Sequence, residues 1–69
     1  MLQQQDVERI LRDVLDSRGL SVSALTVERI TAGWRVAVTD IAHRVVAIEF
    51  PNGPPAAIRA VLARWADDT

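Results

Sequence analysis

Hydrophobic and polar residues alternate along residues 34–40 and again along residues 44–50. When the two segments are aligned antiparallel with Trp34 opposite Phe50, one face collects large apolar side chains and the other collects small and charged ones. This alternation predicts a β-hairpin with a short loop and one face turned toward a core. The apolar face consists of Trp34, Val36, Val38, Val46, Ile48 and Phe50.

The second face of the hairpin is a candidate surface for binding a partner. It is flat, it has small side chains in its middle, and Arg35 faces Glu49 across the strands. Such a surface suits close packing of a neighbour, although small and β-branched residues are also common on an ordinary exposed sheet. The candidate partner-binding residues are Arg35, Ala37, Thr39, Val45, Ala47 and Glu49.

A helical pattern precedes the hairpin and another follows it. Residues 3–18 are expected to form a helix that ends at Gly19, a residue type typical of the position after a helix. A second helix is expected to begin at Pro54 or Pro55, because proline is tolerated in a first turn. The two apolar stripes are Val7, Ile10, Leu11, Val14 and Leu15, and then Ile58, Val61, Leu62 and Trp65.

Another strand is expected between the first helix and the hairpin. It covers about residues 25–31, or begins further upstream through a bulge, and it turns at Ala32-Gly33. The register of this first turn stays open. Pairing Val27 with Val38 is one solution, and it places Arg29 on the core side near an edge.

Together these elements predict an α+β fold in the order α-β-β-β-α. Because each helix has one apolar stripe and the hairpin has one apolar face, both helices are expected to pack on the same face of a three-stranded antiparallel sheet. No linker, repeat or low-complexity segment divides the chain, so residues 1–69 are expected to form a single compact domain.

Composition narrows the classes of function. The chain has no cysteine, which excludes disulfides and thiolate metal sites, and its net charge of −1 gives no general attraction to nucleic acid or acidic membranes. All eight basic residues are arginine, which fits GC-rich codon usage and a bacterial or phage source. With neither a signal-peptide pattern nor an apolar run of about 18 residues, the expected location is the cytoplasm.

The sequence offers little catalytic chemistry. A single histidine, His43, lies in the hairpin loop and could act as a general base oriented by Asp40. No motif supplies a nucleophile, and no carboxylates cluster beside His43 at metal-ligand spacing. The expectation is therefore a protein that is not an enzyme and that uses neither a metal nor another cofactor.

The start of the second helix reads Pro54-Pro55-Ala56-Ala57-Ile58-Arg59, and it follows one helix and three strands. This element order resembles that of double-stranded-RNA-binding domains. The resemblance implies phosphate contacts from the arginines of the sheet and the second helix. The lysine cluster usual at this point in such domains is replaced by a single arginine. The arginines concerned are Arg29, Arg35, Arg44 and Arg59.

The leading expectation is a small non-enzymatic protein-interaction module of the adaptor, regulator or inhibitor type. Its partner would be another protein or a second copy of the chain, bound through the second sheet face or through an unblocked strand edge. Nucleic-acid binding is the alternative.

Overall fold

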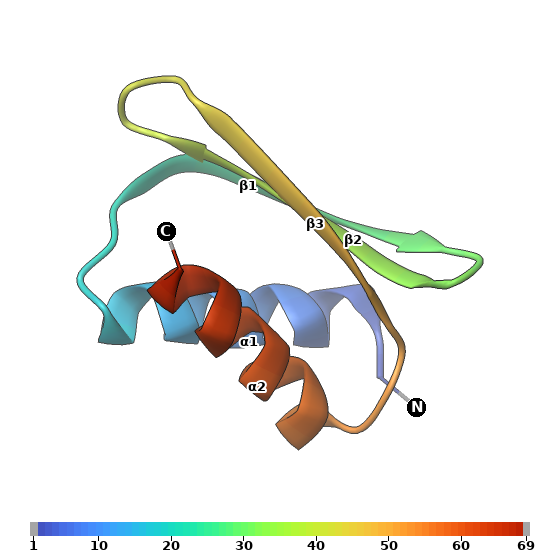
Figure 1. Cartoon of the computed structure of the whole chain (residues 1–69). Helices are drawn as coiled ribbons and strands as arrows, with labels where there is room; N and C mark the ends of the chain where they lie inside the picture. The colour runs from blue at the N-terminus through green and yellow to red at the C-terminus, as the bar shows by residue number, and fades with distance from the viewer. Residues whose placement is uncertain (1, 69) are drawn as a thin grey trace.

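The computed structural model describes residues 2–68 of the chain. Residues 1 and 69, which the predicted domain includes, lie outside the described residues. The predicted α+β class and the α-β-β-β-α order are confirmed (Figure 1). The elements are α1 (Gln4–Ser17), β1 (Val22–Ile30), β2 (Gly33–Asp40), β3 (Val45–Pro51) and α2 (Pro55–Asp67).

The strands form an antiparallel sheet in the order β1-β2-β3. The predicted register of β2 against β3 is confirmed at every pair, from Trp34 opposite Phe50 to Thr39 opposite Val45. The loop between them closes where the Asp40 N–H donates to the Arg44 carbonyl at 3.0 Å. The alternation of side chains therefore specified this hairpin fully, because a slip of one residue would exchange its two faces.

The first hairpin differs from the expected pairing. Val27 lies opposite Val36 rather than Val38, and Gly33 belongs to β2, so the turn is Thr31-Ala32 instead of Ala32-Gly33. The strand begins upstream of the register shift between Val22 and Ala24, as the bulge alternative predicted.

Gly33 explains why the turn shifts by one residue. Its φ of +149° is a conformation that L side chains rarely adopt, and a Cβ at this position would lie 2.3 Å from the Phe50 carbonyl oxygen. The glycine is therefore needed where β3 passes close to β2. It does not form the turn itself.

Both helices lie on the same side of the sheet (Figure 1). The whole predicted stripe of α1 is buried. After α1, Gly19 adopts a φ of +66°, and Leu20 N–H donates to the Leu15 carbonyl, so the predicted glycine ending is confirmed. The stripe of α2 is rotated slightly from the prediction, since Ala66 is buried while Val61 is 38% exposed.

The helix layer covers β1 and β2 better than β3. Helix α1 packs against β1, and α2 packs against α1. Arg18 on the turn after α1 bonds Asp67 of α2 at 2.6 Å, and Asp13 bonds Arg59 between the two helices.

The expected core therefore needs one correction, at β3. Val36 and Val38 of β2 are buried, whereas Val46 is 38% exposed and Ile48 is only half-buried. The periodicity of α2 correctly identified its buried side but could not show that α1, rather than β3, would be its main neighbour.

Candidate functional site

The six predicted partner-binding residues lie together on the side of the sheet that carries no helix. Ala24, Thr26 and Glu28 of strand β1 lie on the same side, because they pair with Thr39, Ala37 and Arg35. We call the surface formed by these nine residues the open face. Its residues are Ala24, Thr26, Glu28, Arg35, Ala37, Thr39, Val45, Ala47 and Glu49.

One end of the open face is a row of charges that runs across all three strands. Arg35 Nε donates to Glu49 Oε2 at 2.8 Å, and Arg35 Nη1 lies 3.8 Å from Glu28 Oε2. The hydrogen bond to Glu49 raises the pKa of Arg35 above its ordinary value. The arginine is thus held between two carboxylates, which orient its guanidinium group.

The rest of the open face is uncharged. Thr26, Ala37 and Ala47 form one row across the sheet, and Ala24, Thr39 and Val45 form the next. Val45 is 67% exposed. Small side chains keep this area flat, so another surface can approach the sheet closely without displacing long flexible groups.

The contribution of β1 to the open face was missed at the sequence level. Its register depended on whether Gly33 stood in the turn or in the strand, and the alternation upstream of residue 25 is irregular. The available signal was Glu28, since an acid in β1 completes a charge row with Arg35 and Glu49 in only one register.

The two edges of the sheet differ. Because Asp40 N–H bonds the Arg44 carbonyl, and hydrogen-bonded pairs alternate along an antiparallel ladder, the backbone groups of Val45, Ala47 and Glu49 point away from β2. They lie along the free edge of β3. Pro51 occupies the next such position, where its missing N–H removes no bond of the ladder.

The β1 edge is occupied at its centre. By the same alternation Leu25, Val27 and Arg29 point their backbone groups outward, and the Gln4 side chain of α1 donates to the Val27 carbonyl. The first turn of α1 thus holds the middle of this edge.

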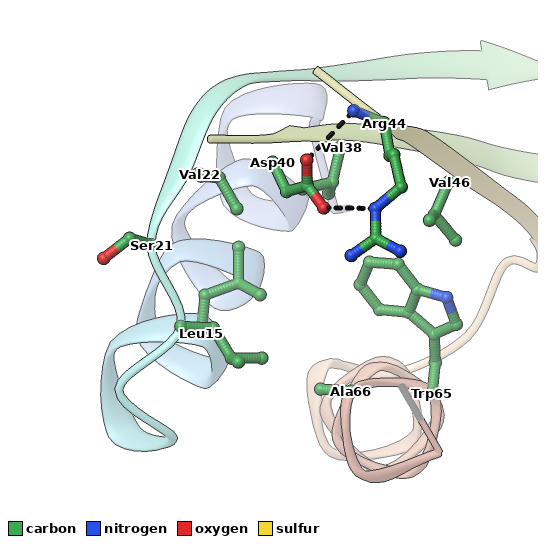
Figure 2. Close-up of a pocket in the computed structure, with 10 residues that line it drawn as sticks. Leu15, Ser21, Val22, Val38, Asp40, Arg44, Val46, Trp65 and Ala66 are labelled. Carbon is green, nitrogen blue, oxygen red and sulfur yellow. Dashed lines mark hydrogen bonds and ion pairs between the residues drawn. The ribbon is translucent and has the colours of Figure 1, made fainter. Parts of the chain in front are cut away.

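A notch of about 230 Å³ opens between the two layers, at the end where both helices finish. Figure 2 shows Trp65 beneath the Arg44 guanidinium on one side, with Leu15 and Val22 on the other. Its walls are mostly apolar, and its charged members, Asp40 and Arg44, bond each other. The notch is smaller than the roughly 300–1,000 Å³ of typical small-molecule sites.

Asp40 holds the hairpin loop in shape. Its Oδ1 accepts the N–H groups of Ala42 and Arg44, both at 2.9 Å, and its Oδ2 accepts Arg44 Nε at 3.2 Å. The bond from the Arg44 backbone lowers the pKa of Asp40 most, with further contributions from Ala42 and the Arg44 guanidinium. His43 contacts Asp40 through its backbone N–H, 3.0 Å from the Asp40 carbonyl.

Three of the four arginines considered for phosphate contact bond carboxylates. Arg35 bonds Glu49, Arg44 bonds Asp40 and Arg59 bonds Asp13. Arg29 is exposed on β1, opposite Trp34. The positive charges of Arg35, Arg44 and Arg59 are therefore largely balanced by neighbouring carboxylates, which weakens the attraction of the surface for a polyanion.

Within residues 2–68, no group of three or more histidine, cysteine, aspartate or glutamate side chains is placed to hold a metal ion. In the same part of the chain, neither helix combines the length and the apolar character needed to cross a membrane. Comparison with models of known protein families, with curated proteins and with solved structures finds no match to this chain.

Proposed function

We propose that this chain is a small non-enzymatic protein-interaction module that binds through the open face of its sheet. The supporting observation is that the helices cover one side of the sheet only. The other side presents an uncharged, small-side-chain centre beside an ordered charge row, Glu28–Arg35–Glu49.

These two parts would contribute differently to binding. The flat centre would supply apolar contact at little cost in side-chain entropy, since alanine has no rotamers to lose. The charge row lies at the rim, where it would favour one orientation of a partner over others rather than add much affinity. Arg35 is the central residue of that row because it bonds one acid and lies near a second.

The proposal also covers the cellular location, the role and the origin of the module. It is a cytoplasmic adaptor, regulator or inhibitor of bacterial or phage origin that works without a metal or another cofactor. The lack of cysteine and the use of arginine alone as the basic residue support this setting.

Site-specific photo-crosslinking in host cells tests the proposal. A photoreactive residue replaces Ala37 at the centre of the open face, and a matched variant carries it at Gln5, an exposed position on α1. We expect a discrete crosslinked product from position 37 that is absent from position 5 and that disappears when Thr26→Arg is added. Equal crosslinking from both positions, or none from position 37, contradicts the proposal.

Nucleic-acid binding ranks second, and the element order α-β-β-β-α is the observation in its favour. Titration of duplex RNA and of duplex DNA at low salt tests it, because phosphate contacts weaken steeply as salt is added. Salt-dependent binding that is lost in Arg29→Ala and unaffected by Thr26→Arg would replace the protein-interaction proposal.

A further inference from the structure

We infer that this chain also pairs with a second copy of itself, and that the two copies join through the free edge of β3. The strands would pair antiparallel about a twofold axis at Ala47, so that two three-stranded sheets become one continuous sheet. This inference goes beyond the proposed function, since it concerns the edge of β3 and leaves the open face of each copy free for its partner.

The backbone of β3 supplies the first argument. Val45, Ala47 and Glu49 all point their N–H and C=O groups away from β2, at the edge where the sheet ends. With the axis at Ala47, Val45 of one copy faces Glu49 of the other, and Ala47 faces its own counterpart. Every outward backbone group of these three residues then meets a donor or an acceptor.

The side chains of β3 supply the second argument. Unlike the buried valines of β2, Val46 is 38% exposed, and Ile48 is half-buried on the helix side. In the proposed register Val46 of one copy lies opposite Ile48 of the other. Ala47, the smallest side chain of the strand, lies at the axis on the open face. Apolar groups therefore meet apolar groups on the helix side, and nothing bulky crowds the axis on the other.

Charge favours this orientation. Glu49 lies near the end of β3, and Arg44 lies just before its start. Antiparallel pairing keeps the two Glu49 side chains at opposite ends of the seam, and it separates the two Arg44 side chains in the same way. A parallel arrangement would place like charges side by side, which destabilises a pair of strands.

The other edge is not equivalent. The Gln4 side chain already donates a hydrogen bond to the Val27 carbonyl at the centre of the β1 edge. A strand added there would have to displace this bond, whereas a strand added to β3 displaces only water.

Disulfide trapping tests the register directly, because the chain has no native cysteine. Residues directly opposite in a hydrogen-bonded pair have Cα atoms about 5.5 Å apart, within the range that a disulfide spans. Mild oxidation of Ala47→Cys should therefore yield a covalent dimer. Val45→Cys should not link to itself, since the two copies of that residue would lie about 13 Å apart along the strands.

A second pair of variants tests the edge in solution. Ala47→Pro removes an outward N–H without removing a bond of the β2–β3 ladder. Arg29→Pro makes the matched change on the β1 edge. In sedimentation velocity, the unchanged chain should dimerise, Ala47→Pro should raise the dissociation constant about tenfold or more, and Arg29→Pro should leave it unchanged. Circular dichroism confirms that both variants remain folded.

Different experimental results would contradict the inference and the proposed function. A chain that stays monomeric at all concentrations, and whose Ala47→Cys variant forms no intermolecular disulfide, overturns the pairing of two β3 strands. Crosslinking at position 37 would be unaffected, because it reports on the open face and not on the edge of β3. A dimer that links through Ala37→Cys but not through Ala47→Cys also overturns the edge pairing, because Ala37 lies one strand away from the seam.

Discussion

At the scale of single residues, Gly33 is held in a position that leaves no room for a side chain. An added Cβ would lie 2.3 Å from the Phe50 carbonyl oxygen and 2.6 Å from the Asn52 backbone nitrogen. Neither neighbour is the end of a flexible side chain, so the backbone itself would have to move.

Replacing this glycine should therefore strongly destabilise the fold. Gly33→Ala is expected to lower the free energy of unfolding by about 3 kcal/mol or more, because steric overlap adds to an unfavourable φ. Gly19→Ala is the matched control, since Gly19 also has a positive φ but nothing lies within 4 Å of its added Cβ. It should cost only about 1 kcal/mol. Urea denaturation measures both, and equal losses would contradict the close-approach explanation.

At the scale of elements, the helix layer is off-centre on the sheet. Val36 is fully buried on β2, whereas Val46 on the neighbouring β3 is 38% exposed. The two residues point to the same side of the sheet, and they differ mainly in what covers them.

This difference predicts unequal costs for the same substitution. Val36→Ala should destabilise the fold by about 2 kcal/mol, from two lost methyl groups and a residual cavity. Val46→Ala should cost less than about 1 kcal/mol, because its side chain is already partly in water. Chemical denaturation at low protein concentration, where association does not contribute, makes the comparison. A cost for Val46→Ala as large as that for Val36→Ala would mean that β3 is better covered than the structure shows.

The elements also show where sequence reasoning succeeded. The β2–β3 register was predictable because both faces of the hairpin are patterned, with Trp34 matched to Phe50 and Arg35 to Glu49. For β1, only one face carries clear alternation, and Gly33 could equally be a turn residue. The docking of α2 was not predictable, because an apolar stripe identifies the buried side of a helix but not its neighbour.

The candidate site was likewise predictable only in part. Its six predicted residues lie on one face because strand alternation guarantees it once the hairpin register is known. The three residues from β1 and the difference between the two sheet edges depend on contacts between distant parts of the chain. Gln4 and Val27, which close one edge, are separated by 23 positions in the sequence.

At the scale of the whole molecule, two carboxylates hold parts of the fold together, and the bonds that they accept favour their ionised form. Asp67 joins α2 to the turn after α1, and Asp40 holds the loop between β2 and β3. The bond from Arg18 lowers the pKa of Asp67, and the backbone bond from Arg44 lowers that of Asp40, each from an ordinary value of 3.8. The folded state thus holds these protons less tightly than the unfolded chain does.

The contribution of these two groups to stability should be complete above about pH 4 and should disappear as the pH falls through their folded pKa values. Urea denaturation between pH 6 and pH 2 measures the loss, and NMR titration of the two carboxyl groups locates it. Asp67→Asn should reduce the acid sensitivity. Arg44→Ala should leave most of the lowering of the Asp40 pKa in place, since a backbone amide is its main cause. Ordinary pKa values for both groups would contradict the assignment.

The bond from Gln4 to Val27 has a consequence for growth of the assembly. A sheet with two free edges can add copies without limit, as in amyloid. A sheet with one blocked edge can pair with only one further copy. In the proposed dimer the joined sheet would therefore have six strands, and α1 of each copy would block the addition of further strands at its outer edge.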